Sequence, residues 1–242
     1  MAKRGVIIVA GGSGRRMGGA LPKQFMMLDN EPILARSINR MHEALPAAEI
    51  VVVLPEEHVE LWKNIAARFD VARHKIALGG KERFHSVKNG LAALSDEVAI
   101  VGIHDAVRPL ASKKLIIKLF LEAENSTAVI PVVAPIDSYR IVEGDDSRII
   151  DRSALRMVQT PQVFQAEALR KARERAEDEV GVAITDAKGK EYRGLGIFDF
   201  TVVEQERVRN TADAIFSLVS ATVRSWVLFE LNSVRVLRSV LP

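Results

Sequence analysis

The chain alternates between short apolar runs and amphipathic segments, and this alternation constrains its fold more than any other feature. The apolar, β-rich runs predict strands at Val6–Ala10, Glu49–Leu54, Lys75–Leu78, Val98–Ile103 and Ala128–Val133. Between them, helical periodicity predicts helices at Glu31–Leu45, Glu57–Phe69, Arg83–Leu94 and Ser112–Glu124, the last with Ser112 as its N-cap. Such alternation indicates an α/β fold with a mostly parallel sheet flanked by helices. Ligands of these folds bind at the carboxyl ends of the strands.

One interval, from Pro135 to Val158, breaks this alternation. Two extended runs, Tyr139–Val142 and Arg148–Ile150, surround a turn at residues 143–146 and predict an inserted β-hairpin. Because a hairpin alone is marginally stable in water, we expect it to pack on another surface. A second subunit is a good candidate for that surface.

The first predicted strand opens into a glycine-rich, cationic loop. Gly11-Gly12-Ser13-Gly14-Arg15-Arg16-Met17 follows the strand, and Pro22-Lys23-Gln24 comes shortly after. Glycines let backbone amides approach an anion, and Arg16 and Lys23 could neutralise charge during phosphoryl chemistry. The loop lacks the Lys-Ser/Thr of a P-loop and the third small residue of a dinucleotide fingerprint. It favours a nucleotide site of another type, and a plain strand–helix connection is the structural alternative.

Two further loops carry candidate site residues. In His104–Pro109, Asp105 could bind Mg²⁺ or orient a substrate hydroxyl, and Arg108 could bind a phosphate through two hydrogen bonds. The alternative is a local Asp–Arg ion pair that fixes the turn. In Gly79–Ser86 the glycines would let the backbone approach the base of a nucleotide, and Ser86 offers a hydroxyl. The structural alternative is a helix N-terminus with an exposed basic turn.

Composition excludes several classes of function. The chain has no cysteine, which rules out disulfides and thiolate chemistry, and its five histidines lack metal-ligand spacing. A net charge of +3, two tryptophans and two tyrosines make a nucleic-acid module improbable. The late apolar segment Ala214–Leu231 contains Arg224 and Glu230 and is too polar for a membrane span. The first strand begins within a few residues of the N-terminus, so we expect no signal peptide and a cytoplasmic protein.

Taken together, the motifs resemble those of the 2-C-methyl-D-erythritol 4-phosphate cytidylyltransferase family from residue 5 to about residue 186. The resemblance rests on the loop after the first strand, Pro22-Lys23-Gln24, the Gly79–Ser86 loop, the His104–Pro109 loop, Asp137-Ser138, Asp151-Arg152 and Gln159-Thr160-Pro161-Gln162. It implies a Rossmann-like fold of the nucleotide-diphospho-sugar transferase type, with one domain over residues 1–232. It also implies a dimerisation arm at residues 136–157. The implied reaction joins CTP and 2-C-methyl-D-erythritol 4-phosphate, in the presence of Mg²⁺, to give CDP-methylerythritol and pyrophosphate in the non-mevalonate isoprenoid pathway. Two alternatives stay open: a ribitol 5-phosphate cytidylyltransferase, and a catalytically silent homologue that binds nucleotide.

The same resemblance implies roles for individual residues. The residues expected around CTP are Ala10, Gly11, Gly12, Gly80, Lys81, Ser86 and Ala106, of which Lys81 stands where the family is often acidic or small. Arg16 and Lys23 correspond to the pair that stabilises the transition state. The residues expected at the sugar phosphate are Asp105, Arg108, Ser138, Thr160 and Thr185, together with the catalytic Arg152. Arg152 and Thr160 would come from the neighbouring subunit, and Asp105 is also the candidate metal ligand.

The tail at residues 187–242 departs from the family pattern. The family carries Thr-Asp-Asp-Ala-Ser and later an Asn-x-Lys-x-Thr segment, but here Thr185-Asp186 is followed by Ala187-Lys188-Gly189. Arg209, before Asn210-Thr211, is the cation nearest to the missing lysine. Divergence, engineering and a late reading-frame error are the three explanations, and a genuine tail of this kind could impair activity.

Overall fold

The computed structural model describes residues 2–11, 21–178, 183–185, 191–193 and 201–204, with side chains described up to residue 172. Its main feature is an eight-stranded sheet in the order β10-β7-β11-β6-β1-β4-β5, with β14 also pairing with β7. The strands are β1 (Lys3–Val9), β4 (Glu49–Leu54), β5 (Lys75–Leu78), β6 (Val98–Asp105), β7 (Ala128–Val133), β10 (Met157–Val158), β11 (Gln162–Gln165) and β14 (Thr201–Glu204). The five strands predicted from the apolar runs are all present.

The sheet is mostly parallel, as predicted. β1 lies between β4 and β6 and pairs with both in parallel, so that Ile7 is opposite Val51 on one side and Ile103 on the other. The exception at the centre is β11, which runs antiparallel between β6 and β7. The sequence analysis did not predict β11, which enters the sheet only after the chain has made the hairpin.

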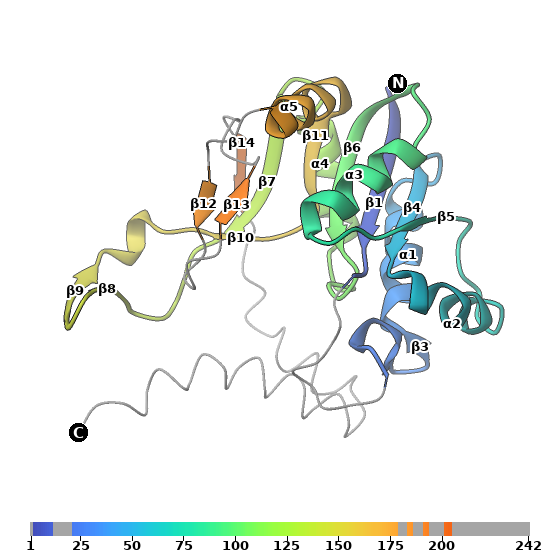
Figure 1. The fold of residues 1–242 in the computed structure, drawn as a ribbon, viewed down its shortest axis with the longest axis horizontal. Coiled ribbons are helices and arrows are strands. Elements are labelled where there is room, and N and C mark those ends of the chain that lie inside the picture. Colours follow the sequence, from blue (N-terminus) through green and yellow to red (C-terminus); the bar gives the residue numbers. More distant parts are fainter. Residues whose placement is uncertain (1, 12–20, 179–182, 186–190, 194–200, 205–242) are drawn as a thin grey trace.

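Helices cover both faces of the sheet (Figure 1). They are α1 (Ile33–Ala44), α2 (Glu56–Ala66), α3 (Arg83–Ala93), α4 (Lys113–Glu122) and α5 (Ala166–Asp178). Alternate residues of β1 face opposite cores, because side chains of a strand point to the two faces in turn. Val6 and Ile8 belong to the core that contains α1, α2 and α4, whereas Ile7 packs in the core with α3 and α5.

The four predicted helices are present, each ending up to three residues before the predicted boundary. The predicted N-cap of α4 is confirmed, since Ser112 Oγ accepts a hydrogen bond of 3.2 Å from the amide of Leu115. Short elements complete the described chain: the 3₁₀ helices η2 (Lys23–Phe25) and η3 (Arg152–Ala154), and the two-stranded pairs β2 (Met27–Leu28) with β3 (Glu31–Pro32) and β12 (Ala183–Thr185) with β13 (Glu191–Arg193).

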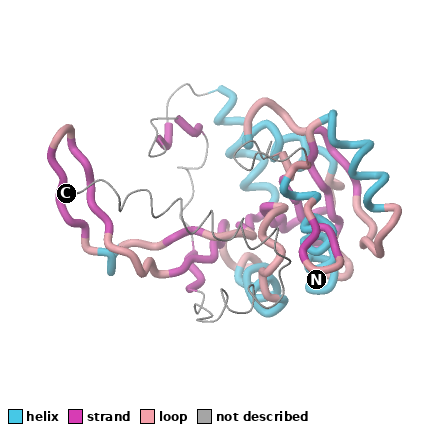
Figure 2. The backbone as a smooth tube through the Cα atoms, turned by 90° about the horizontal axis from the view of Figure 1, so that it is seen from below, coloured by secondary structure: helices cyan, strands magenta, loops and turns pink. Residues whose placement is uncertain are grey.

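The chain forms a hairpin in the interval that interrupts the alternation. β8 (Tyr139–Glu143) and β9 (Asp146–Ile150) pair as a separate antiparallel sheet, and Gly144 in its turn has φ +64°. Figure 2 shows the hairpin lying apart from the main body. Val142 and Ile149 are 71% and 74% exposed, so the hairpin buries little apolar surface within its own chain. Its role as a dimerisation arm stays a prediction.

Within the described ranges, no helix combines the length and the apolar character that crossing a bilayer requires. The segment Ala214–Leu231, which the sequence analysis found too polar for a membrane span, lies outside the described residues.

Candidate nucleotide site

A cavity of about 670 Å³ opens where β1, β4, β5 and β6 end. This is the edge at which parallel α/β sheets bind ligands, because loops that leave neighbouring strands meet there. Eight residues predicted for the site line the cavity: Ala10, Gly11, Lys23, Gly80, Lys81, Ser86, Asp105 and Ala106. The loops after three separate strands therefore meet around one space, as the sequence analysis expected.

Lys23 is held at the cavity by its neighbours in η2. The side chain of Gln24 is buried, and its Nε2 donates a 3.0 Å hydrogen bond to the carbonyl oxygen of Ala10, the residue directly after β1. Phe25 stacks on Trp62 of α2, with 6.0 Å between the ring centroids. These contacts tie the segment that carries Lys23 to β1 and to α2. Gln24 belongs to the Pro-Lys-Gln motif, but nothing in the sequence indicated that its amide supports the loop.

The loop after β5 is shaped by Ser86. Its hydroxyl accepts a hydrogen bond of 3.1 Å from the amide of Gly80 and donates one of 3.2 Å to the carbonyl of Glu82. A Cβ at Gly80 would lie 2.3 Å from the Cβ of His85, so only glycine fits this approach to the first turn of α3. Ser86 is buried, and its hydroxyl organises the loop as an internal hydrogen-bonding group.

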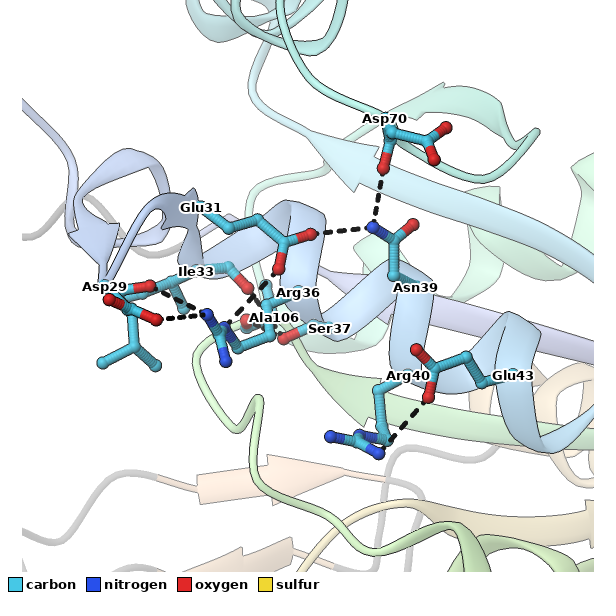
Figure 3. A network of polar contacts seen from close by, with 11 residues as sticks. Asp29, Glu31, Ile33, Arg36, Ser37, Asn39, Arg40, Glu43, Asp70 and Ala106 are labelled. Atoms are coloured by element: carbon cyan, nitrogen blue, oxygen red, sulfur yellow. Dashed lines mark hydrogen bonds and ion pairs between the residues drawn. The ribbon is translucent and has the colours of Figure 1, made fainter. Parts of the chain in front are cut away.

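Backbone amides at three of the predicted CTP positions are used inside the protein. The amide of Ala10 donates to Val53 O at 2.9 Å, that of Ala106 to Val9 O at 3.1 Å, and that of Gly80 to Ser86. The carbonyl of Ala106 is also engaged, because Ser37 Oγ of α1 donates to it at 2.7 Å (Figure 3). These residues therefore form a rigid wall of the cavity.

Asp105 forms two ion pairs at the end of β6. Its Oδ1 lies 3.0 Å from Arg83 Nη2 and its Oδ2 lies 3.0 Å from Arg108 Nε. Arg108 also donates to the side-chain oxygen of Gln159. The local Asp–Arg pair weighed in the sequence analysis is thus present. The partners Arg83 and Gln159 were missed, because neither lies near Asp105 in the sequence.

His104, next to Asp105, is buried and hydrogen-bonded at both ring nitrogens. Nε2 faces Arg108 O at 3.1 Å, and Nδ1 faces Thr160 Oγ1 at 3.1 Å. Burial lowers the pKa of His104 to about 4, because a charged imidazolium would lose its hydration there. The residue is a neutral hydrogen-bonding group at neutral pH.

The remaining predicted residues lie away from the cavity or outside the described chain. Arg152 Nη1 donates to Ile136 O at 2.5 Å, at the base of the hairpin, and Ser138 is exposed just before β8. Thr160 is buried, with its hydroxyl bonded within its own chain. Thr185 is described only as the backbone of β12. Gly12, Arg16 and Arg209 lie outside the described residues.

Another part of the cavity wall was missed by sequence analysis. Pro55, Glu56 and Glu57, at the start of α2, line the same space as the glycine loops. They follow β4 directly, in the way that the glycine-rich loops follow β1 and β5. That position after a predicted strand was the only signal that could have identified them.

Comparisons with known proteins identify the family. A family model described as 2-C-methyl-D-erythritol 4-phosphate cytidylyltransferase matches residues 5–207, which extends past the end of the resemblance seen in the motifs. The enzyme of that name from Bacteroides fragilis is 44% identical over 173 residues, which span 71% of this chain and 78% of the relative. The Phocaeicola vulgatus enzyme of that name is 42% identical over 170 residues, which span 70% and 77%.

Solved structures show the same fold. The Francisella tularensis 2-C-methyl-D-erythritol 4-phosphate cytidylyltransferase aligns with a TM-score of 0.66 and 25% identity over 89% of this chain and 97% of its own. The 4-diphosphocytidyl-2C-methyl-D-erythritol synthase of Anaerococcus prevotii aligns with a TM-score of 0.69 and 22% identity over 89% and 96%. The family match over most of the chain, the two relatives above 40% identity and the cavity at the carboxyl edge of the sheet agree, and the chain belongs to the 2-C-methyl-D-erythritol 4-phosphate cytidylyltransferase family.

Proposed function

We propose that this chain joins CTP and 2-C-methyl-D-erythritol 4-phosphate to give CDP-methylerythritol and pyrophosphate, in the non-mevalonate route to isoprenoids and in the cytoplasm. The observation that carries the proposal is the convergence of the motifs after β1, β5 and β6 on one cavity, in a chain that belongs to this family. The cavity volume of about 670 Å³ lies in the range of small-molecule sites.

The proposed chemistry depends on charge and position. A phosphate monoester has a second pKa of about 6, so the polyol phosphate is largely a dianion at neutral pH and needs no general base. It attacks the α-phosphorus of CTP in line, and pyrophosphate leaves. Lys23 lines the cavity and would stabilise the charge that grows at the α-phosphate, together with Arg16. Asp105 and Arg108 would bind the polyol phosphate.

Asp105 does not fit a protein-built magnesium site. Mg²⁺ needs several oxygen ligands, but both carboxylate oxygens of Asp105 are paired with guanidinium groups at 3.0 Å. Among the residues that the structure describes, no group of three or more His, Cys, Asp or Glu could hold a metal ion. The proposed need for Mg²⁺ therefore concerns the triphosphate, and the assignment of Asp105 as a metal ligand has no support from its contacts.

A pyrophosphate-release assay tests the proposed reaction. We expect turnover with CTP and 2-C-methyl-D-erythritol 4-phosphate, and Lys23→Ala should lower kcat about 10²- to 10³-fold. Lys63→Ala removes an exposed lysine that pairs with Glu60 on α2 and should leave kcat unchanged. Turnover with ribitol 5-phosphate alone would favour the ribitol enzyme. CTP binding in calorimetry without turnover would favour a silent homologue, and near-normal turnover of Lys23→Ala would refute the role of Lys23.

We also propose that the hairpin binds a second copy of the chain, as the exposed apolar side chains of Val142 and Ile149 suggest. Light scattering coupled to size exclusion should give a dimer for the wild type and a monomer for Ile149→Asp. Ile117→Asp makes the same change at an exposed position of α4 and should stay dimeric. A wild-type monomer, or a dimeric Ile149→Asp, would refute this role of the hairpin.

A further inference from the structure

A series of hydrogen bonds through the buried side chains of His104 and Thr160 adjoins the Asp105–Arg108 ion pair. The amide of Asp105 is 3.2 Å from Thr160 Oγ1, which is 3.1 Å from His104 Nδ1, and His104 Nε2 is 3.1 Å from Arg108 O. His104 and Thr160 are only 1% and 7% exposed. These hydrogen bonds join the end of β6 and the turn after it to the segment between β10 and β11, which lies far away in the sequence.

The direction of each hydrogen bond follows from the groups involved. An amide can only donate, so Thr160 Oγ1 accepts from Asp105, and its single proton goes to His104 Nδ1. A carbonyl can only accept, so Nε2 of His104 carries the ring proton and donates it to Arg108 O. The two ring nitrogens therefore have opposite roles, and the imidazole works as a spacer of fixed length.

We propose that His104 is a positioning residue for the reaction and that it acts through Thr160 and the backbone of Arg108. The ring holds the carbonyl of Arg108 on one side, and through Thr160 it holds the amide of Asp105 on the other. The guanidinium of Arg108 also donates a hydrogen bond to Gln159, the neighbour of Thr160. Asp105 and Arg108 are therefore both hydrogen-bonded to the same short segment. This inference rests on the proposed function, which assigns Asp105 and Arg108 to the polyol phosphate.

The role of Thr160 in this arrangement is internal to one chain. Its hydroxyl is satisfied on both sides, by the Asp105 amide and by His104 Nδ1. It therefore sets the position of the residues proposed to meet the substrate, without itself facing the cavity. The resemblance to the family had instead suggested that Thr160 reaches a sugar phosphate bound to the neighbouring subunit, which stays a prediction.

Steady-state kinetics with both substrates tests the role of the hydrogen bonds. Thr160→Val keeps the side-chain shape and removes the hydroxyl, and we expect the KM for 2-C-methyl-D-erythritol 4-phosphate to rise about tenfold while the KM for CTP changes less than about twofold. His104→Asn should show the same selective rise. Thr160→Ser restores the hydroxyl and should return the KM close to the wild-type value. His42→Asn, at an exposed position of α1, is the matched histidine control and should match the wild type.

A second readout does not depend on turnover. Nitrogen NMR of the histidine rings should show His104 as the neutral form with the proton on Nε2, in the wild type and in Thr160→Ser, and a changed Nδ1 signal in Thr160→Val. The positioning role is overturned if Thr160→Val leaves the KM for the polyol phosphate unchanged, if Thr160→Ser fails to restore it, or if both KM values rise equally. A wild type that releases no pyrophosphate would refute the proposed function, and an Nδ1 signal that is the same in wild type and Thr160→Val would separately overturn the hydrogen-bonded arrangement.

Discussion

Replacing Ser37 by alanine should weaken both the fold and the nucleotide site, because this serine links α1 to the cavity wall. Ser37 is 1% exposed, and its hydroxyl lies 2.7 Å from Ala106 O and 3.1 Å from Ile33 O. Figure 3 shows Ser37 beside Ala106. Ile33 lies one turn earlier in the same helix, where its carbonyl is an ordinary backbone acceptor. The bond that matters is therefore the one to Ala106.

The size of the effect follows from the bonds that are lost. Leaving a buried carbonyl without its partner costs about 1–3 kcal/mol. Alanine is the better helix former by about 0.5 kcal/mol, which offsets part of this cost. The net loss is about 0.5–2.5 kcal/mol, and for a domain of this size each kcal/mol lowers Tm by about 2–4 °C, so Tm should fall by about 1–10 °C. Because Ala106 lines the cavity, the Kd for CTP should rise roughly fivefold, which corresponds to about 1 kcal/mol.

Thermal unfolding followed by circular dichroism, and calorimetry with CTP, measure the two effects. Ser112→Ala is the matched control, since it removes a serine bond that caps α4, and Ser112 is not among the residues that line the cavity. It should lower the free energy of unfolding by about 1 kcal/mol while leaving the Kd for CTP unchanged. An unchanged Tm for Ser37→Ala, or an equal loss of CTP affinity in both variants, would refute this account of the cavity wall.

Three other predictions concern stability and the site. Hydrogen bonds from Ser95 and Lys3 lower the pKa of Glu49 to about 2, so its carboxylate stabilises the fold above its unfolded pKa of about 4.5, and this contribution is lost as the pH falls toward 2. Glu49→Gln should lower the free energy of unfolding by about 1–2 kcal/mol at pH 7, a modest amount because water screens the partly exposed lysine partners. In urea unfolding at a series of pH values, the difference between wild type and variant should disappear as the pH falls from about 4.5 toward 2. A difference that stays constant with pH would contradict this prediction. Trp62→Phe keeps a ring against Phe25 but removes the 3.0 Å bond to His74, and should cost about 1 kcal/mol in urea unfolding. Gly80→Ala would place its Cβ 2.3 Å from the Cβ of His85 and should abolish measurable CTP binding in calorimetry, whereas normal binding would show that the loop can move.

The five predicted strands and four predicted helices could be identified from the local sequence, because each has its own pattern of apolar residues. The runs Glu49–Leu54, Lys75–Leu78 and Ala128–Val133 are strands with the predicted ends, since apolar residues bounded by Gly, Pro or charge suffice to mark a strand. β11 was not predicted. It is four residues long and obtains its partners from β6 and β7, which lie far away along the chain. A strand whose stability comes from such pairing has little local signature.

The candidate site also contains some residues that could be predicted from the sequence and others that could not. Residue type and local motif were enough to name candidates for the proposed chemistry, because glycine-rich turns and cations are recognisable in the sequence: Lys23, Asp105 and Arg108 were all predicted from their motifs. The groups that hold these candidates in place became apparent from the folded chain. Gln24 supports Ala10, Ser37 supports Ala106, and Thr160 meets His104 across 56 positions. A hydrogen bond between distant residues exists only once the sheet has brought their segments together, so such partners cannot be identified from residue type or local spacing.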